Sequence, residues 1–184
     1  MAASHTGSTV VLRPWRPSDR EALAGLANDR RISINLRDGF PYPYAVEDAD
    51  RFIAMAQGME PQTHSAIEAS GQLAGGIGYT LHADVERIAA EVGYWIGVPF
   101  WGRGVATEAV RLVTAMAFSH HPELRRLYAL PFASNPASAR VLEKAGYRRE
   151  AVLRQSAIKA GVVQDQWMYA MLRDEATRPE DLRR

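Results

Sequence analysis

The sequence predicts a single α+β domain, because strand-like and helix-like segments alternate along its 184 residues without a repeat or a domain linker. Two observations lead to this prediction. Three consecutive strand-like runs, Thr63 to Glu68, Leu73 to Leu81 and Ile88 to Val98, are separated by short turns, as in an antiparallel meander. A helical segment from Gly104 to Ser119 follows, with apolar residues at spacings of three and four.

The segments before the meander predict one strand and two helices. Thr9 to Arg13 has the composition of a short strand, and Ser18 is a candidate N-cap for the helix after it. Val46 to Gln57 predicts a second amphipathic helix. The loop over residues 38–44 contains two prolines and three aromatic residues, which indicates an ordered wall rather than a flexible linker.

The segments after the long helix predict a strand, a helix and a hairpin. The strand is expected over Arg126 to Phe132, and Asn135-Pro136 supplies an N-cap and a first-turn proline for a helix that ends at Gly146. Tyr147 to Ile158 and Val162 to Leu172 then form two strand-like runs around a short turn. In total the sequence predicts about seven strands and four helices in the order β-α-α-β-β-β-α-β-α-β-β.

Composition excludes several classes of protein. The 22 basic and 21 acidic residues leave a net charge of +1, so no global field would attract nucleic acid or an anionic membrane. The absence of cysteine excludes disulfides, a thiolate metal site and a cysteine nucleophile. No apolar run approaches the roughly 20 residues that span a bilayer, and residues 1–9 lack the apolar core of a signal peptide. We therefore expect a cytoplasmic protein with no metal, a flexible N-terminus over residues 1–9 and a charged tail over residues 174–184.

The most informative motif is a glycine-rich turn between the third strand of the meander and the long helix. Gly102 and Gly104 lack a Cβ, so backbone N–H groups can approach an anion at the positive end of the helix. A phosphorylated ligand is therefore one interpretation. The other is a helix start that binds nothing, which an isolated pair of glycines cannot exclude.

Two other phosphate-binding motifs fit this turn poorly. A Walker loop needs a lysine and a hydroxyl residue after its last glycine, but Gly104 is followed by Val105-Ala106. A dinucleotide-binding loop needs a third glycine, where this chain has Thr107, and a parallel βαβ unit, whereas the preceding strands are expected to be antiparallel.

Several motifs together resemble the GNAT acetyltransferase superfamily, and within it the ribosomal-protein-alanine N-acetyltransferases of the RimJ/RimL type. The resemblance extends from about Val10 to Leu172, and a domain over residues 10–173 is expected from it. The segments that carry it are Trp101 to Ala109 and Asn135 to Tyr147, together with Leu12 to Trp15, Glu91 to Trp95, Gly161, Asp165 and Tyr169. Trp101 departs from the glutamine or arginine common in the superfamily, but tryptophan is familiar in the Rim-type branch.

The resemblance implies a mixed, mostly antiparallel sheet that splays between its fourth and fifth strands, with acetyl-CoA bound as a co-substrate in the gap. Backbone groups at the end of the fourth strand would pair with the pantetheine arm, and the glycine turn would bind the pyrophosphate. The residues implied to bind the cofactor are Ile96, Gly97, Val98, Gly102, Arg103, Gly104, Val105, Ala106, Thr107, Asn135 and Ser138.

The resemblance also implies an N-acetyltransferase in which an amine attacks acetyl-CoA directly in a ternary complex. Ser138 would be the general acid, although a serine in the first turn of a helix is also an ordinary capping residue. Glu91 would be the base through a water molecule, although it is equally well a solvated strand-end carboxylate. The tyrosine and glutamate that many relatives use are replaced here by Leu142 and Ala157.

We expect the acceptor pocket between the first helices and the last hairpin. The absence of a strong candidate base favours an amine of low pKa, such as a protein N-terminal α-amine, over a lysine amine. A small-molecule amine such as a polyamine or an aminoglycoside remains an alternative acceptor. A CoA-binding module without catalytic activity and a plain interaction protein are alternative functions, and a homodimer is possible. The residues expected around the acceptor are Asn35, Arg37, Phe40, Tyr42, Tyr44 and Trp167.

Overall fold

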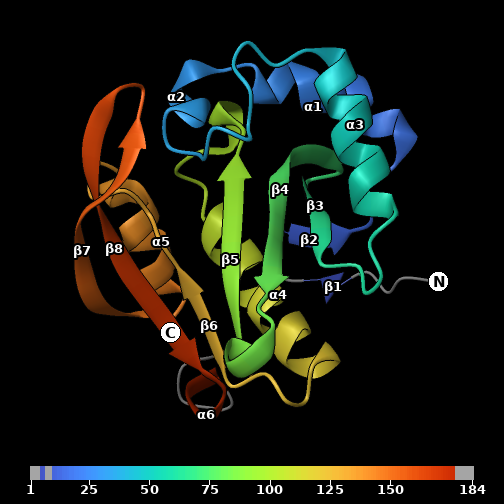
Figure 1. The fold of residues 1–184 in the computed structure, drawn as a ribbon. Helices are drawn as coiled ribbons and strands as arrows, with labels where there is room; N and C mark the ends of the chain where they lie inside the picture. Colours follow the sequence, from blue (N-terminus) through green and yellow to red (C-terminus); the bar gives the residue numbers. More distant parts are fainter. Residues whose placement is uncertain (1–4, 7–9, 177–184) are drawn as a thin grey trace.

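Eight strands form one sheet in the computed structural model, which describes residues 5–6 and 10–176 (Figure 1). Along the sheet their order is β1-β2-β3-β4-β5-β6-β8-β7. The expectations for residues 1–9, apart from His5–Thr6, and for residues 177–184 lie outside the described residues. The strands are β1 (His5–Thr6), β2 (Val10–Arg13), β3 (His64–Ala69), β4 (Gln72–Leu81), β5 (Ala89–Ile96), β6 (Arg126–Ala129), β7 (Arg148–Lys159) and β8 (Val162–Leu172).

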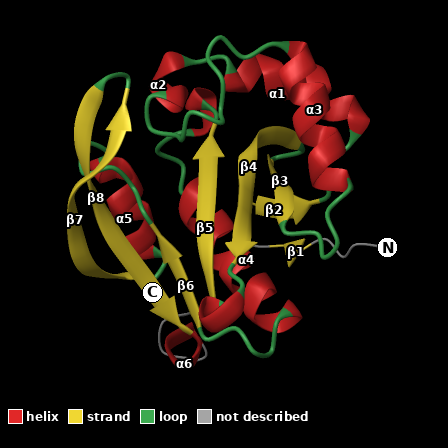
Figure 2. Cartoon of the chain, viewed as in Figure 1, coloured by secondary structure: helices red, strands yellow, loops and turns green. Residues whose placement is uncertain are grey.

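Four helices of eight or more residues cover the sheet (Figure 2). Helix α4 packs against β2, β4 and β5 on one side of the sheet, while α1 packs against α3 and β4. The predicted α+β fold, with seven strands and four main helices, is confirmed; the two-residue β1 and the short helices α2 and α6 are additional. The helices are α1 (Arg20–Ala27), α2 (Arg30–Ser33), α3 (Val46–Gln57), α4 (Val105–His120), α5 (Pro136–Lys144) and α6 (Arg173–Ala176).

The sheet is antiparallel except where β5 pairs with β6. Their parallel register covers only the three pairs from Ala89↔Arg126 to Glu91↔Tyr128, although β5 continues to Ile96 alongside β4. Beyond Glu91 the two strands diverge, as Figure 1 shows between β5 and β6. The splay therefore lies between the fourth and fifth of the predicted strands, as the resemblance to the GNAT superfamily implied.

Two apolar clusters lie on the two faces of the sheet. The larger one includes Val92 and Ile96 of β5 and the buried face of α4, including Val113 with no exposed surface. The smaller one joins α1 and α3 to Trp15, and Trp95 of β5 packs against it. Alternation along β5 thus sends neighbouring side chains into different clusters.

An ion-pair network fixes the N-terminal strand to the first helix. Both guanidinium NH₂ groups of Arg13 donate to Asp19 at 2.8 Å, and its Nε donates to Glu68 at 2.7 Å. The Asp19 carboxylate also accepts from the Arg16 N–H at 2.8 Å. The helical region begins with a 3₁₀ turn over Pro17–Asp19. The side chain that anchors the start of this region is therefore the carboxylate of Asp19, and not the hydroxyl of the predicted cap, Ser18.

Two details differ from the sequence prediction. Strand β6 ends at Ala129 instead of Phe132, because Pro131 has no N–H to continue the ladder. Phe132 forms only an isolated bridge to Gln166. Strand β7 has the expected length but begins and ends one residue later than expected, and the turn of the hairpin uses positive φ angles of 50° at Ala160 and 78° at Gly161.

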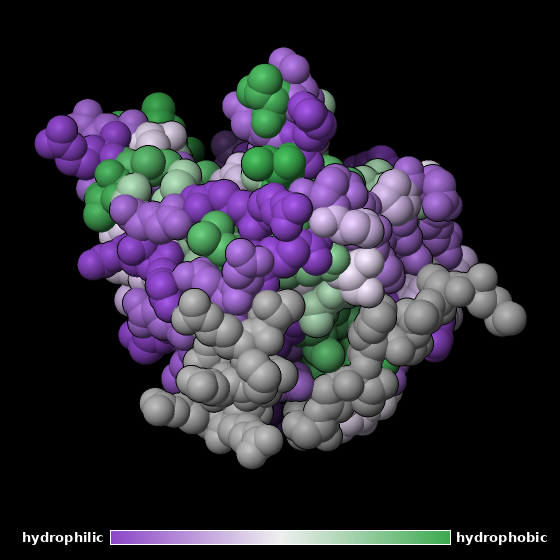
Figure 3. Space-filling view, turned by 90° about the horizontal axis from the view of Figure 1, so that it is seen from below, coloured by the Kyte–Doolittle hydropathy of each residue, from purple (hydrophilic) through white to green (hydrophobic). Residues whose placement is uncertain are grey.

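The face in Figure 3 is mainly hydrophilic, with hydrophobic residues in separate small groups. Within residues 5–6 and 10–176, no helix is long and apolar enough to cross a bilayer. The same residues contain no cluster of three or more histidine, aspartate or glutamate side chains that would hold a metal ion.

Candidate active site

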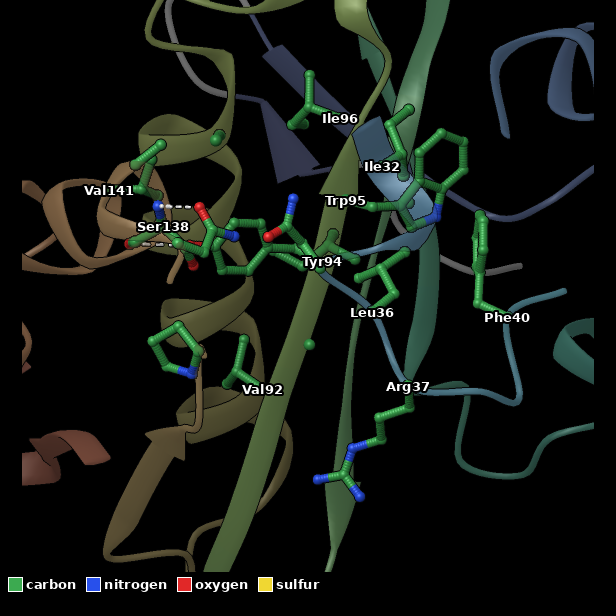
Figure 4. Close-up of a pocket in the computed structure, with 18 of the residues that line it drawn as sticks. Ile32, Leu36, Arg37, Phe40, Val92, Tyr94, Trp95, Ile96, Ser138 and Val141 are labelled. Atoms are coloured by element: carbon green, nitrogen blue, oxygen red, sulfur yellow. Dashed lines mark hydrogen bonds between the residues drawn. The ribbon is translucent and has the colours of Figure 1, made fainter. Parts of the chain in front are cut away.

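A cavity of about 1020 Å³ opens where β5 and β6 diverge (Figure 4). It extends from the N-terminus of α4, past β5 and α5, to the loop between α2 and α3. Successive side chains of β5 point to opposite sides of the cavity. Tyr94 points toward α5, whereas Trp95 points the other way, toward Phe40 (Figure 4). The cavity therefore has one end near the α4 turn and another among the aromatic residues of the first helices.

The α4 end of the cavity presents a glycine turn to any ligand. Gly102 and Gly104 have φ angles of +74° and +79°, and a Cβ added to either would meet no atom within 4 Å. The helical hydrogen bonds begin with Glu108 N–H donating to the Gly104 carbonyl at 3.1 Å. The N–H groups of the first turn, from Val105 to Thr107, thus precede the helical ladder, an arrangement that suits an anion at a helix N-terminus.

The end of β5 is held by the side chain of Trp101. Its indole Nε1 donates to the Ile96 carbonyl at 2.7 Å, and the Arg31 guanidinium lies 6.0 Å from the ring centroid. The Gly97 N–H donates to the Ala74 carbonyl at 2.8 Å. The Gly97 and Val98 carbonyls also accept, from the N–H groups of Phe100 and Trp101. Four of the backbone groups expected to pair with pantetheine therefore already have protein partners. The part of β5 without a strand neighbour on the β6 side is Val92 to Ile96.

Ser138 lies in the first turn of α5, directly opposite Tyr94. Its hydroxyl is 2.7 Å from the Tyr94 hydroxyl, which also donates to the Ser138 carbonyl at 3.2 Å. Asn135 caps the helix, because its Oδ1 accepts from the Ser138 N–H at 3.2 Å. The pKa of Tyr94 is raised to about 12, because the effect of burial outweighs the hydrogen bond with Ser138, which acts to lower the pKa.

Leu142 has no exposed surface and lies outside the cavity wall, so α5 offers no acid at that position. Ala157 does line the cavity, but its methyl group has no proton to exchange. Both observations agree with the sequence analysis. Tyr94, which sequence reasoning missed as a functional residue, is the phenol that reaches Ser138 instead.

Aromatic side chains surround the opposite end. The ring centroid of Phe40 lies 4.9 Å from that of Tyr44 and 5.6 Å from that of Trp95. Glycines on β4 make room for them, since a Cβ on Gly76 would lie 2.9 Å from the Trp95 Nε1. Gly93 lies between Glu91 and Trp95 on β5, and a Cβ added to it would meet no atom within 4 Å. The middle of the cavity is therefore open at this position.

His64 is a second residue of the cavity wall that the sequence did not single out. It begins β3, and a Cβ on Gly78 would lie 2.9 Å from its ring, so this glycine allows the ring to lie against β4. Its Nδ1 is 3.0 Å from the Thr63 hydroxyl. Burial lowers the pKa of His64 from its ordinary value, which favours the neutral form of the ring.

Glu91 is the sole carboxylate among the described residues that line the cavity. Its Oε1 accepts from the Nη2 of Arg37, whose side chain is 73% exposed. The neighbouring Tyr128 has a raised pKa because of burial and, secondly, the charge of Glu91. The other charged groups of the described wall are four cations: Arg31, Arg37, Arg140 and Lys144.

The cavity brings together most of the residues singled out from the sequence. Three of the cofactor candidates, Gly97, Val98 and Arg103, lie outside its wall, as does Trp167. Tyr42 instead lines a smaller pocket of about 290 Å³ beside Lys159 and Asp38. The candidates in the wall are Asn35, Arg37, Phe40, Tyr44, Glu91, Ile96, Gly102, Gly104, Val105, Ala106, Thr107, Asn135 and Ser138.

Known proteins share this sequence pattern and this fold. Residues 9–148 match the acetyltransferase (GNAT) domain. The "Probable N-acetyltransferase YjcK" of Bacillus subtilis (strain 168) is 31% identical over 176 residues, which cover 90% of this chain and 95% of the relative. YdaF of the same bacterium, whose name proposes ribosomal N-acetyltransferase activity, is 33% identical over 176 residues, 90% of this chain and 92% of its own.

A solved structure of RimL, described as a ribosomal L7/L12 alpha-N-protein acetyltransferase in complex with coenzyme A, has the same fold. Its TM-score is 0.80 at 20% identity, over 94% of this chain and 99% of that one. The chain therefore belongs to the GNAT acetyltransferase family, and it is an acetyl-CoA-dependent N-acetyltransferase.

The residues of the cavity fit coenzyme A. The glycine turn and the first turn of α4 suit a pyrophosphate, and Arg140 and Lys144 place positive charge in the same wall. The unpaired edge of β5 suits an extended amide-containing arm. Acetyl-CoA supplies the activated acetyl group, and Ser138 and Tyr94 lie in the wall of the same cavity.

Proposed function

We propose that the enzyme acetylates the α-amine of a protein or peptide N-terminus, by direct attack of that amine on acetyl-CoA in a ternary complex. The observation that carries this proposal is the state of Glu91, the sole carboxylate among the described residues of the cavity wall, which already pairs with Arg37. The described wall therefore offers no unpaired carboxylate to the several positive charges of a polyamine or an aminoglycoside. A peptide N-terminus brings one amine and an uncharged backbone.

The acidity of the amine supports the same choice. At pH 7 an α-amine with a pKa near 7.8 is about 14% neutral, whereas a lysine amine with a pKa near 10.4 is about 0.04% neutral. The difference corresponds to roughly 3 kcal/mol of deprotonation free energy that an enzyme with little base equipment would have to supply. The names of YdaF and RimL, which refer to ribosomal proteins, agree with an N-terminal acceptor.

In this proposal each side chain has a separate task. Glu91 accepts the proton of the attacking amine through a water molecule, and Arg37 holds the carboxylate in place. Phe40, Tyr44 and Trp95 exclude water around the first residue of the acceptor. Ser138 donates a proton to the departing sulfur, with Asn135 fixing the turn from which it does so.

The test is a thiol-release assay with matched acceptors. Short peptides with free N-termini are compared with the same peptides carrying a formyl-blocked N-terminus and an internal lysine, and with spermidine and kanamycin. We expect CoA release with the free N-termini and acetylation of the α-amine by mass spectrometry. Faster turnover of spermidine or kanamycin would refute the acceptor, and tight CoA binding without thiol release from any amine would indicate a CoA-binding module.

A further inference from the structure

We infer that Tyr94 is a positioning residue that supplies Ser138 with its proton during acetyl transfer. This inference rests on the proposed role of Ser138 as the group that protonates the sulfur. Tyr94 belongs to β5 and lies across the splay from Ser138 of α5. The sequence of α5 explains why a partner is needed, since Ser138 is the sole hydroxyl residue between Pro136 and Lys144.

The two hydroxyl groups are placed for proton exchange. Their oxygens are 2.7 Å apart, a distance typical of O–H···O hydrogen bonds. Ser138 cannot drift away from Tyr94, because its backbone N–H is held by Asn135 and its carbonyl accepts from the Tyr94 hydroxyl at 3.2 Å. Figure 4 shows the Tyr94 side chain extending from β5 to Ser138.

Two hydrogen-bond arrangements are available to this pair. When the Tyr94 proton points to the Ser138 carbonyl, the Ser138 hydroxyl donates to Tyr94. When Tyr94 donates to the Ser138 Oγ instead, the serine proton is free to point into the cavity. The second arrangement is the one that prepares Ser138 to act as an acid, and it requires the Tyr94 hydroxyl as its donor.

A phenol is a stronger acid than an alkyl alcohol, so it can replenish the serine. The amine nitrogen forms the C–N bond with the acetyl carbon, the C–S bond breaks, and sulfur leaves with the bonding electron pair. The Ser138 proton passes to that sulfur while the Tyr94 proton passes to the Ser138 oxygen. The proton that the attacking nitrogen loses as it becomes the amide passes through a water molecule to Glu91 and then to solvent, and the Tyr94 phenolate regains a proton from water through Ser138 once the thiol has departed.

The experiment is a double-mutant cycle with Tyr94→Phe and Ser138→Ala, in which Tyr79→Phe is the matched control. Tyr79 is a buried tyrosine of the same core whose hydroxyl bonds to His121 at 3.1 Å, and it does not line the cavity. Each variant is assayed for kcat, for KM of acetyl-CoA and of the peptide, and for CoA affinity by calorimetry. Thermal unfolding without ligand gives the coupling between the two hydroxyls independently of activity.

We expect Tyr94→Phe to lower kcat by about 10-fold or more, toward the lower range for general acids, with CoA affinity and both KM values within twofold of wild type. The double variant should be no slower than Ser138→Ala alone, and Tyr79→Phe should retain wild-type kcat. Losses that multiply, an unchanged kcat in Tyr94→Phe, or a loss seen equally in CoA affinity would each overturn the role of Tyr94. Wild-type protein that releases no thiol with the peptides would instead refute the proposed N-terminal acceptor, a failure distinct from that of Tyr94.

Discussion

Arg37, in the loop after α2, forms an ion pair with Glu91, in the middle of the sheet, although the two residues are 54 positions apart in the sequence. The guanidinium is mostly exposed, whereas the carboxylate is 23% exposed at the cavity wall. The pair therefore joins a surface loop to the site of the proposed amine, and it connects the position of that loop with the position of the base.

The first prediction separates the catalytic value of this pair from its value for stability. Exposed ion pairs contribute about 0–1 kcal/mol, so Arg37→Ala should lower the free energy of unfolding by less than about 1 kcal/mol. It should nevertheless raise the KM for the peptide several-fold, because Glu91 loses the group that orients it. Arg20→Ala is the matched control, since Arg20 forms an exposed pair with Asp50 at 2.9 Å outside the cavity wall. Equal kinetics in the two variants would contradict the role of Arg37.

The second prediction concerns acid stability and Asp19. Burial alone would raise the pKa of Asp19, but the hydrogen bonds from Arg13 and Arg16 outweigh it and hold the pKa below 3.8. A carboxyl whose pKa is depressed in the folded state stabilises the protein above its unfolded pKa, near 3.9, and this stabilisation is lost as the pH falls below that value toward the folded pKa.

Removing one partner of this network should be costly at neutral pH. Arg13→Ala leaves two carboxylates without their cation and should lower the free energy of unfolding by about 3–5 kcal/mol at pH 7. Its unfolding free energy should also fall less steeply than that of wild type below pH 4. Urea unfolding at a series of pH values measures both effects, and parallel pH curves for the two proteins would argue against Asp19 as the titrating group.

The third prediction uses the open space at Gly93. An alanine there would meet no atom within 4 Å, and it should leave stability unchanged or improve it, because alanine restricts the unfolded chain. The added methyl group projects into the cavity, so turnover should fall while the melting temperature does not. Gly25→Ala in α1 is the control, since it too meets no atom within 4 Å but does not line the cavity. Full activity in Gly93→Ala would show that this space is not used.

The fourth prediction concerns the turn before α4. Gly104 has a φ of +79°, where an L-residue with a Cβ costs roughly 1–2 kcal/mol, so Gly104→Ala should destabilise the protein by that amount. Gly161→Ala in the β7–β8 turn, with φ +78° and equally open surroundings, should carry the same backbone cost. Only Gly104→Ala should also reduce the increase in melting temperature that CoA produces. A similar CoA response in both variants would place the pyrophosphate elsewhere.

Local patterns predicted the elements more accurately than the contacts between them. The spacing of apolar residues located α4 to within one residue, and Asn135-Pro136 located the start of α5 because both the cap and the proline are local devices. Helix α2 was missed because it is a single turn whose Asp29 cap lies in a stretch without an apolar period. Strand β6 was predicted too long because apolar composition does not register the missing N–H of Pro131.

In the candidate site, too, locally determined features were predicted and contacts between distant segments were not. The glycine turn could be found from sequence because its backbone conformation requires glycine at particular positions. Tyr94 could not be found, since alternation on β5 separates two faces but does not say which face α5 covers. Arg37 was expected near the acceptor, but its pairing with Glu91 depends on how the loop after α2 folds over the sheet.

The short parallel pairing of β5 with β6 also means that residues outside the cavity affect its affinity for a ligand. Three residue pairs join β1–β5 to β6–β8 across the sheet, and the cavity opens where this pairing has ended. The width of the gap is therefore set by residues remote from it, such as Ala90 and Leu127 at the paired end. Substitutions at these two positions should change the affinity for acetyl-CoA, although neither residue lines the cavity.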